Sequence, residues 1–174
     1  LAPDPHHEGQ WYYACGINGL YRSTNDGRSF EQVEALEVAF PGEAQTYGVY
    51  LHPTVPDRLY VVRGDLIQSD DAGETWFETS LGLDWMTSFA IHPEMPSVMY
   101  VGGGRGTVMW SNDSGASWTE SSLVAADGDG TYARQILPDP LDSSVAWAQD
   151  GSTLFKTEDG GVSWSLVYGF GLWA

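Results

Sequence analysis

Basic residues are scarce in this sequence: seven lysine and arginine residues stand against 24 aspartate and glutamate residues, and Lys156 is the only lysine. The net charge of −17 leaves no basic stripe that could neutralise a phosphate backbone, which argues against nucleic acid as a partner. The acidity favours solubility in a salty or extracellular setting. The alternative is the attraction of cations or of basic partners.

Cysteine is also scarce, and long apolar runs are missing. Cys15 is the only cysteine, so no intrachain disulfide can form, and the redox compartment stays open. No run of about 18 apolar residues occurs, so the sequence predicts no membrane-spanning helix. No basic and then apolar leader begins at Leu1, which indicates either that a leader was removed or that the sequence is an excised piece.

Glycine and aromatic residues are plentiful, and this composition is typical of one domain with many short strands and tight turns. One eight-residue pattern occurs four times: hydroxyl, x, Asp or Asn, x, Gly, x, Ser or Thr, large aromatic. We call each copy a box. The boxes cover residues 23–30, 69–76, 111–118 and 157–164, so their closing aromatics lie 46, 42 and 46 residues apart. A fixed period in this range indicates a repeat architecture.

Each position of a box has a physical reason. The side-chain oxygen at the third position can accept hydrogen bonds from backbone N–H groups just ahead of it, and the glycine supplies the positive φ of a tight turn. The closing aromatic is expected as the first inward residue of the next strand. The residues with these roles are Ser23, Asn25, Gly27 and Phe30; Ser69, Asp71, Gly73 and Trp76; Ser111, Asp113, Gly115 and Trp118; and Thr157, Asp159, Gly161 and Trp164.

The box resembles the Asp-box, or BNR repeat, of sialidase-type β-propellers, which sortilin-like receptors and xyloglucan-processing glycosidases also contain. The resemblance covers essentially the whole chain. It implies an all-β fold, a β-propeller of four Asp-box blades, in which each blade is a four-stranded antiparallel meander and helix is nearly absent. The first box departs from the family pattern, because Asn25 stands in place of Asp and Phe30 in place of Trp.

We expect one propeller domain over residues 1–174, with blades at 1–38 plus 169–174, 39–82, 83–124 and 125–168. The first blade has only a stub of its first strand, and residues 169–174 have the sequence expected just before a Pro-Asp-Pro turn. The C-terminal strand is therefore expected to complete the first blade. Strand sharing of this kind closes a ring within one chain or joins chains head to tail, and the alternative is that both ends were cut from a longer array.

The resemblance also implies that the boxes form a structural girdle on one face of the propeller, while ligands bind on the other face. The residues expected to bind ligand there are Tyr47, Arg63, Trp85, Arg105, Tyr132, Arg134 and Trp173. The aromatic members could form a platform for sugar rings, or they could plug the central channel.

Catalysis would require acidic residues on the same face. The candidates are Asp65, Asp84, Asp127, Asp129 and Asp150, because glycoside hydrolysis needs two carboxylates about 5–10 Å apart. In so acidic a chain, turn geometry and solvation explain such loop aspartates better. Sialidase chemistry is disfavoured, because the Arg-Ile-Pro-like motif of sialidases is absent and four blades are fewer than sialidases use.

No metal and no cofactor are predicted. His52 and His92 each precede a proline and are explained as repeated turn residues, and His6-His7 lacks a carboxylate partner at a recognisable spacing. The sequence favours a non-catalytic extracellular propeller that serves as a binding or assembly module, with a protein or polysaccharide ligand, within a larger secreted or filamentous protein. The alternative is a fragment of a glycoside hydrolase propeller that acts on a plant-type or other polysaccharide.

Overall fold

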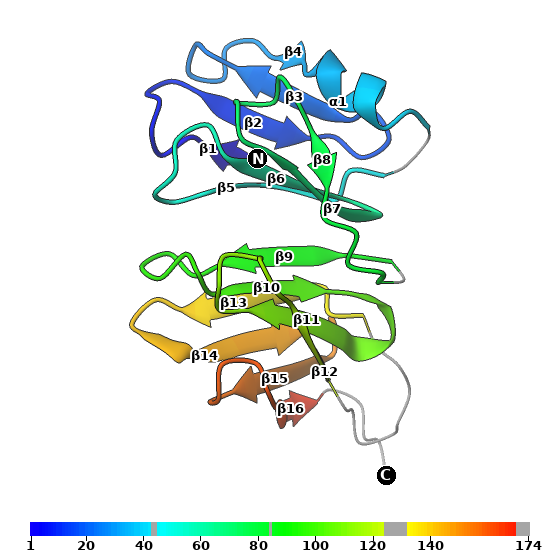
Figure 1. The fold of residues 1–174 in the computed structure, drawn as a ribbon, viewed down its shortest axis with the longest axis vertical. Helices are drawn as coiled ribbons and strands as arrows, with labels where there is room; N and C mark the ends of the chain where they lie inside the picture. The colour runs from blue at the N-terminus through cyan, green and yellow to red at the C-terminus, as the bar shows by residue number, and fades with distance from the viewer. Residues whose placement is uncertain (43–44, 84, 124–131, 170–174) are drawn as a thin grey trace. The chain divides into compact units, whose positions relative to one another are not determined.

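Four separate four-stranded sheets account for almost all of the regular structure (Figure 1). The computed structural model describes residues 1–42, 45–83, 85–123 and 132–169. In every sheet the strands are hydrogen-bonded to their neighbours in chain order, and every pairing is antiparallel. The predicted all-β fold with four four-stranded meanders is thereby confirmed.

The strand bounds follow the repeat. The first sheet contains β1 Ala2–Pro3, β2 Trp11–Ala14, β3 Leu20–Ser23 and β4 Glu31–Gln32, and the second contains β5 Gly48–Leu51, β6 Leu59–Arg63, β7 Asp65–Ser69 and β8 Phe77–Glu78. The third contains β9 Ser88–Ile91, β10 Met99–Gly102, β11 Thr107–Ser111 and β12 Thr119–Ser122, and the fourth contains β13 Gln135–Asp139, β14 Asp142–Gln149, β15 Thr153–Thr157 and β16 Ser165–Gly169. Each box links the third strand of its sheet to the fourth.

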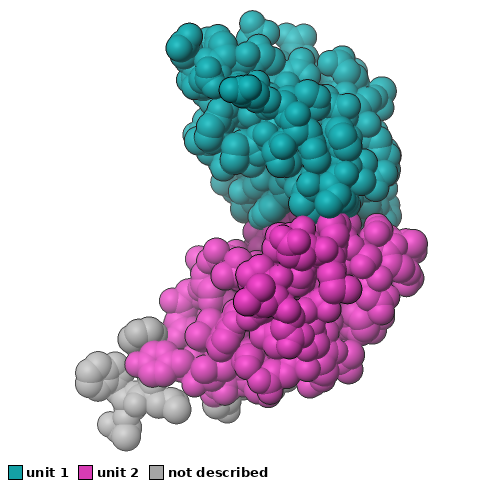
Figure 2. Space-filling model, turned by 90° about the vertical axis from the view of Figure 1, so that its left-hand side faces the viewer, with its two compact units in different colours: residues 1–82 teal, residues 83–174 magenta. Residues whose placement is uncertain are grey.

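The chain forms two compact units, Leu1–Gly82 and Leu83–Ala174, which Figure 2 shows in teal and magenta. Unit 1 holds the first and second sheets, with β2 beside β5, and unit 2 holds the third and fourth, with β9 beside β13. Each unit has its own hydrophobic core between its two sheets. The expectation that all 174 residues form one propeller domain stays a prediction.

The cores follow from the alternation of side chains along each strand, since successive residues of a strand point to opposite faces of the sheet. In unit 1 the core includes Tyr12, Leu59, Val61 and Ile67, all at most 2% exposed. In unit 2 the fully buried Tyr100, Val108 and Phe155 play the same part. Burial of these side chains supplies the main driving force for packing two sheets together.

Two short helical segments interrupt the strands. Helix α1, Glu34–Ala39, follows the first sheet, and a single 3₁₀ turn, η1 Gly104–Gly106, separates β10 from β11. Helix is otherwise nearly absent from the part of the chain that the structure describes, as predicted.

The first strand of the first sheet is short. Strand β1 pairs only with the start of β2, where Ala2 is opposite Tyr12 and Pro3 is opposite Trp11. Residues 170–174, which were expected to complete this blade, lie outside the described residues. Sharing of the C-terminal strand, within one chain or between chains, therefore stays a prediction.

Candidate functional site

The four boxes share one hydrogen-bond pattern. In the second box the Ser69 hydroxyl donates to Asp71 Oδ1 at 2.9 Å and accepts from the Gly73 N–H at 2.9 Å. Asp71 Oδ1 also accepts from the Thr75 N–H at 2.8 Å. The other three boxes repeat these contacts around Asn25, Asp113 and Asp159. The box side chains are thus used to hold their own turns.

These contacts favour the ionised form of the box carboxylates, because N–H and O–H donors stabilise the negative charge. The Ser117 hydroxyl and backbone N–H, together with the Ser111 hydroxyl, lower the pKa of Asp113 to about 2. Hydrogen bonds from Thr75 lower the pKa of Asp71, and hydrogen bonds from Ser163 lower the pKa of Asp159. All three boxes therefore carry a negative charge at neutral pH.

The closing aromatics of the boxes are half-buried, where the sequence predicted buried anchors. Trp76 and Trp118 turn their rings back over the box, so that Nε1 donates to the carbonyl of Gly73 at 2.9 Å and of Gly115 at 3.0 Å. Trp164 instead donates to Ser121 Oγ of the third sheet at 3.2 Å and packs against Tyr100. The indole N–H needs an acceptor, and this requirement keeps one edge of each ring at the surface.

Arg63, expected as a ligand-binding residue, lies buried in unit 1. Its guanidinium forms an ion pair with Glu37 of α1, with Nη2 to Oε2 at 2.8 Å, and donates to the carbonyl of Gly42 at 3.0 Å. Only 1% of the Arg63 side chain is exposed. Tyr47, the other expected residue of unit 1, has an exposed side chain. Arg63 thus ties α1 to the second sheet in this structure.

Unit 2 brings four of the expected ligand-binding residues to one end of β10. The Thr87 N–H donates to the carbonyl of Gly102 at 2.9 Å, and the Ala133 N–H donates to the carbonyl of Gly103 at 3.2 Å. The Thr87 hydroxyl donates to the carbonyl of Ala133 at 3.0 Å. We call this meeting of three loops the loop junction. Four of the expected ligand-binding residues lie within two residues of these contacts in the chain: Trp85, Arg105, Tyr132 and Arg134.

The side chains at the loop junction are exposed, and two of them have strained backbones. Trp85 is 70% exposed and Tyr132 is 44% exposed, while both arginines also lie at the surface. Trp85 and Arg105 both have φ of 57°, in the left-handed region that bulky residues rarely adopt. Strain of this kind persists only where the surrounding structure imposes it, and it concentrates at functional sites. The junction is the strongest candidate for a binding site among the described residues.

Two of the five candidate catalytic carboxylates can be placed, and both hold turns. Asp65 Oδ1 accepts from the backbone N–H groups of Leu66 at 2.7 Å and Leu81 at 3.4 Å. Asp150 Oδ1 accepts from the N–H groups of Ser152 at 2.7 Å and Thr153 at 2.6 Å. Asp84, Asp127 and Asp129 lie outside the described residues, as does Trp173. The described residues therefore present no assembled acid/base pair from this set.

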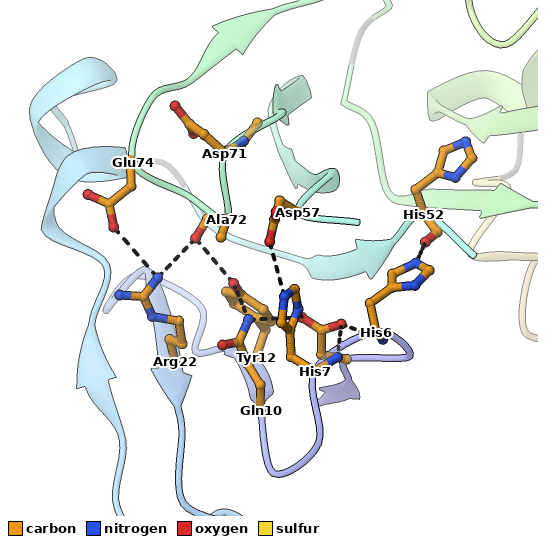
Figure 3. A network of polar contacts seen from close by, with 12 residues as sticks. His6, His7, Gln10, Tyr12, Arg22, His52, Asp57, Asp71, Ala72 and Glu74 are labelled. Carbon is orange, nitrogen blue, oxygen red and sulfur yellow. Dashed lines mark hydrogen bonds and ion pairs between the residues drawn. The ribbon is translucent and has the colours of Figure 1, made fainter. Parts of the chain in front are cut away.

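A polar network in unit 1 was not anticipated from the sequence (Figure 3). Tyr12 and Arg22 both donate to the carbonyl of Ala72 in the second box, at 3.1 and 3.2 Å. The Arg22 guanidinium also lies 3.6 Å from Glu74. One sequence signal could have pointed to this network. In three of the four sheets, the second residue of the second strand is a tyrosine: Tyr12, Tyr60 and Tyr100.

The N-terminal turn joins the same network. His7 lies between two carboxylates, with Nδ1 3.2 Å from Asp4 and Nε2 3.6 Å from Asp57, although the sequence indicated no carboxylate partner for it (Figure 3). His6 contacts the carbonyl of His52 at 3.1 Å. Even so, the residues that the structure describes include no group of three or more His, Cys, Asp or Glu side chains arranged to hold a metal ion. Nor does any helix in the described ranges have the length and apolar character needed to cross a membrane.

The structure is similar to solved β-propellers, although no family model and no curated protein matches the sequence. An ancestral GH74 enzyme is 18% identical with a TM-score of 0.78, over 98% of this chain and 24% of its own. The GH74 xyloglucanase from Xanthomonas campestris is 20% identical with a TM-score of 0.77, over 97% of this chain and 29% of its own. YCF48 bound to D1 peptide is 13% identical with a TM-score of 0.60, over 98% of this chain and 60% of its own.

These similarities concern the fold. The chain spans about a quarter of the length of the two GH74 enzymes, and its identity to all three structures is at most 20%. Four consecutive four-stranded antiparallel meanders and propeller neighbours over nearly the whole chain lead to one conclusion. The protein has the β-propeller fold.

Proposed function

We propose that this chain is an Asp-box propeller segment that binds an extended polysaccharide at the loop junction of unit 2 without cleaving it. The observation that carries the proposal is the pair of bulky exposed residues, Trp85 and Arg105, held with φ of 57° beside the same backbone junction. A strained backbone that fixes a large aromatic in solvent is costly for stability alone. A ligand-binding role explains why it is kept.

The chemistry of the junction suits a carbohydrate chain. The Trp85 and Tyr132 rings offer apolar faces on which the C–H faces of sugar rings can stack, and the Tyr132 hydroxyl can exchange hydrogen bonds with sugar hydroxyls. Arg105 and Arg134 provide planar guanidinium groups with several donors each. The net charge of −17 argues against a polyanion as the ligand.

Membership of the Asp-box class is supported by the boxes themselves. The same three hydrogen bonds recur in all four copies, including the copy with Asn25. The absence of cleavage is supported by Asp65 and Asp150, whose Oδ1 atoms accept turn hydrogen bonds. An extracellular location is part of the proposal, since it accords with a polysaccharide ligand, and fractionation of the source cells would test it.

A second candidate function is a part of a glycoside hydrolase. The observation that favours it is the similarity to two GH74 enzymes over 97–98% of this chain. In this case the chain would supply one wall of a cleft, and the catalytic carboxylates would be completed by other residues of a longer protein. The two functions differ in product, because only the second releases sugar from the polymer.

The experiment is affinity electrophoresis in gels that contain xyloglucan or another soluble polysaccharide, combined with an assay for released reducing sugar. Trp85→Ala and Tyr132→Ala should each weaken retardation about tenfold, which corresponds to ~1.4 kcal/mol of binding free energy. The control is Phe77→Ala on β8, because Phe77 is 46% exposed and lies in unit 1. Equal retardation of Trp85→Ala and the parent protein would overturn the proposed site, and released sugar would favour the hydrolase.

A further inference from the structure

Unit 2 contains a second hollow, at the opposite end of β10 from the loop junction. The cavity measures about 440 Å³, which lies within the range of about 300–1,000 Å³ found for small-molecule sites. Its walls come from the turn before β10, the end of β11 with the third box, the start of β14 and the fourth box. We call it the box pocket. Its lining residues include Met95, Trp110, Asn112, Ser144, Asp159 and Gly160.

Trp110, which lines this pocket, and Tyr100, its neighbour on β10, each have a buried hydrogen-bond donor without a partner in the described part of the chain. Among the described residues, no atom accepts from the Tyr100 hydroxyl or from Trp110 Nε1, and both atoms are buried. Tyr100 and Trp110 are directly opposite each other on β10 and β11, so their side chains emerge on the same face of the sheet. That face is directed toward the fourth box. An unpartnered buried donor costs about 1–3 kcal/mol, so such a pair calls for an explanation.

Unit 1 shows how the same position is normally satisfied. Tyr12 and Arg22 are opposite each other on β2 and β3, as Tyr100 and Trp110 are in unit 2. Both side chains donate to the carbonyl of Ala72, the fourth residue of the second box (Figure 3). The fourth residue of the fourth box is Gly160, which lines the box pocket. In unit 2 the two donors have no such acceptor among the described residues, and Gly160, at the equivalent box position, borders the box pocket.

The space beside Gly160 is open. A Cβ atom at Gly160 would meet no atom within 4 Å, and the φ of 74° is close to the values of 60° and 61° found for Ala72 and Ser114 at the same box position. A ligand oxygen that enters beside Gly160 can take the place that the Ala72 carbonyl has in unit 1. We propose that the box pocket binds a neutral polyhydroxylated ring, a single pyranose unit, with its oxygens accepting hydrogen bonds from Tyr100 and Trp110.

The remaining walls fit that ligand. Asn112 can accept from and donate to ring hydroxyls, and the Ser144 hydroxyl, which donates to Asp142 Oδ1, can accept from them. Met95 with the Trp110 indole offers an apolar surface for the C–H face of the ring. Hydrogen bonds from Ser163 lower the pKa of Asp159, so the pocket carries a negative charge that disfavours anionic ligands. Burial, aided by Asp159, raises the pKa of Tyr100 to about 12, so its hydroxyl remains a donor at neutral pH.

The test is a titration followed by the indole N–H resonances in ¹H–¹⁵N NMR spectra, with the methyl β-glycosides of glucose, galactose and xylose as probes and inorganic phosphate as the anionic contrast. At least one glycoside should shift the Trp110 indole resonance in a saturable manner, and phosphate should leave it unchanged. The Trp85 indole resonance reports separately on the loop junction. A shift of Trp85 alone would overturn the box pocket and leave the proposed function untouched.

Two variants and one control sharpen the test. Tyr100→Phe keeps the ring and removes the donor, so glycoside binding should weaken about tenfold while the melting temperature stays equal or rises. Gly160→Asn should fill the pocket without disturbing the turn, because Asn tolerates positive φ, and binding should be lost. Tyr12→Phe, at the equivalent place in unit 1, should lower the melting temperature and leave binding intact.

Three outcomes would overturn the inference. The first is that no glycoside shifts the Trp110 indole resonance. The second is that Tyr100→Phe binds glycoside as tightly as the parent protein. The third is that Tyr100→Phe lowers the melting temperature as much as Tyr12→Phe does. The last outcome would mean that the Tyr100 hydroxyl already has a partner equivalent to the Ala72 carbonyl. Because the first two outcomes do not depend on stability, the proposal can fail even if one variant folds poorly.

Discussion

The hydroxyl of Tyr12 donates a 3.1 Å hydrogen bond to the carbonyl of Ala72, 60 residues further along the chain. This bond links the second strand of the first sheet to the turn of the second box. Tyr12→Phe should therefore lower the free energy of unfolding by about 1 kcal/mol, the usual net value of one buried hydrogen bond. Urea unfolding followed by circular dichroism measures this change in the free energy of unfolding.

The matched control for that prediction is Tyr47→Phe in the same unit. The Tyr47 side chain is exposed, so removal of its hydroxyl should change the free energy of unfolding by less than about 0.5 kcal/mol. If both variants unfold at the same urea concentration as the parent protein, the Tyr12 to Ala72 bond does not stabilise unit 1.

The Glu37–Arg63 ion pair allows a second prediction. Glu37→Gln would leave the buried Arg63 guanidinium without its counter-charge, and breaking a buried pair costs about 3–5 kcal/mol. Because 29% of the Glu37 side chain is exposed, solvent screening should reduce the loss to about 2–3 kcal/mol. Chemical denaturation measures the loss, and amide exchange should show that α1 opens first.

The comparison pair for this experiment is Lys156 and Glu158, which lies at the surface of unit 2. Glu158→Gln should change stability by less than about 1 kcal/mol, because exposed ion pairs contribute little. The double variant Glu37→Met with Arg63→Met should recover much of the loss, since a buried ion pair can be replaced by apolar side chains at little net cost. A double variant as unstable as Glu37→Gln would contradict this account.

The lowered pKa values of the box carboxylates should make the boxes less stable in acid. The folded pKa of Asp113 is about 2 and lies below its ordinary value, so the stabilisation by this carboxylate is fully present above about pH 4 and is lost as the pH falls toward 2. Asp71 and Asp159 have pKa values shifted in the same direction. Amide exchange at Ser117 should accelerate across this window, beyond the intrinsic pH dependence of exchange.

The first box is a natural control for that experiment, because Asn25 makes the same contacts without a titrating group. Its Oδ1 accepts from the Ser29 N–H at 3.0 Å and from the Ser23 hydroxyl at 3.0 Å. Protection of the Ser29 amide should stay constant while that of Ser117 falls, and Asp113→Asn should make the third box equally insensitive to acid. Parallel loss of protection in both boxes would point to global unfolding instead.

Substitution of Gly161 tests how tightly the fourth box packs against the third sheet. A Cβ there would lie 2.9 Å from Trp110 Cγ and 2.9 Å from Tyr100 Cε1, and the residue has φ of 101°. Gly161→Ala should therefore cost about 2–4 kcal/mol through overpacking and backbone strain. Gly160→Ala has open space beside it and should cost about 1 kcal/mol, for the positive φ alone. Thermal melts that show equal losses for the two variants would refute the close approach.

The fold was predictable because its information is local. Each box fixes a turn within eight residues, and the apolar strands before it can pair only with their immediate neighbours in the chain. Sheet order and antiparallel pairing follow from this without knowledge of distant contacts. The contacts between sheets are different, since no sequence pattern links Tyr12 to Ala72 or Glu37 to Arg63.

The sequence named residues for the candidate site, and their ligand-binding role stays a prediction. Trp85, Arg105, Tyr132 and Arg134 were expected on the ligand face from the resemblance, and three loops of unit 2 carry them beside one junction. The ion pair of Arg63 depends on α1, a six-residue helix too short to stand out from a loop in the sequence. The box pocket was recognised from two donors without an acceptor, a feature that has no signal in the sequence.

The strand order of the sheets also bears on how such a protein can gain sheets during evolution. Every sheet is a meander of four consecutive strands, without a crossover and without a strand borrowed from another sheet among the described residues. A gene duplication that copies one box with the strands around it therefore adds a complete sheet, and no existing ladder of hydrogen bonds has to be broken. Propellers of different blade number can arise in this way by recombination at the links, while the boxes remain unchanged.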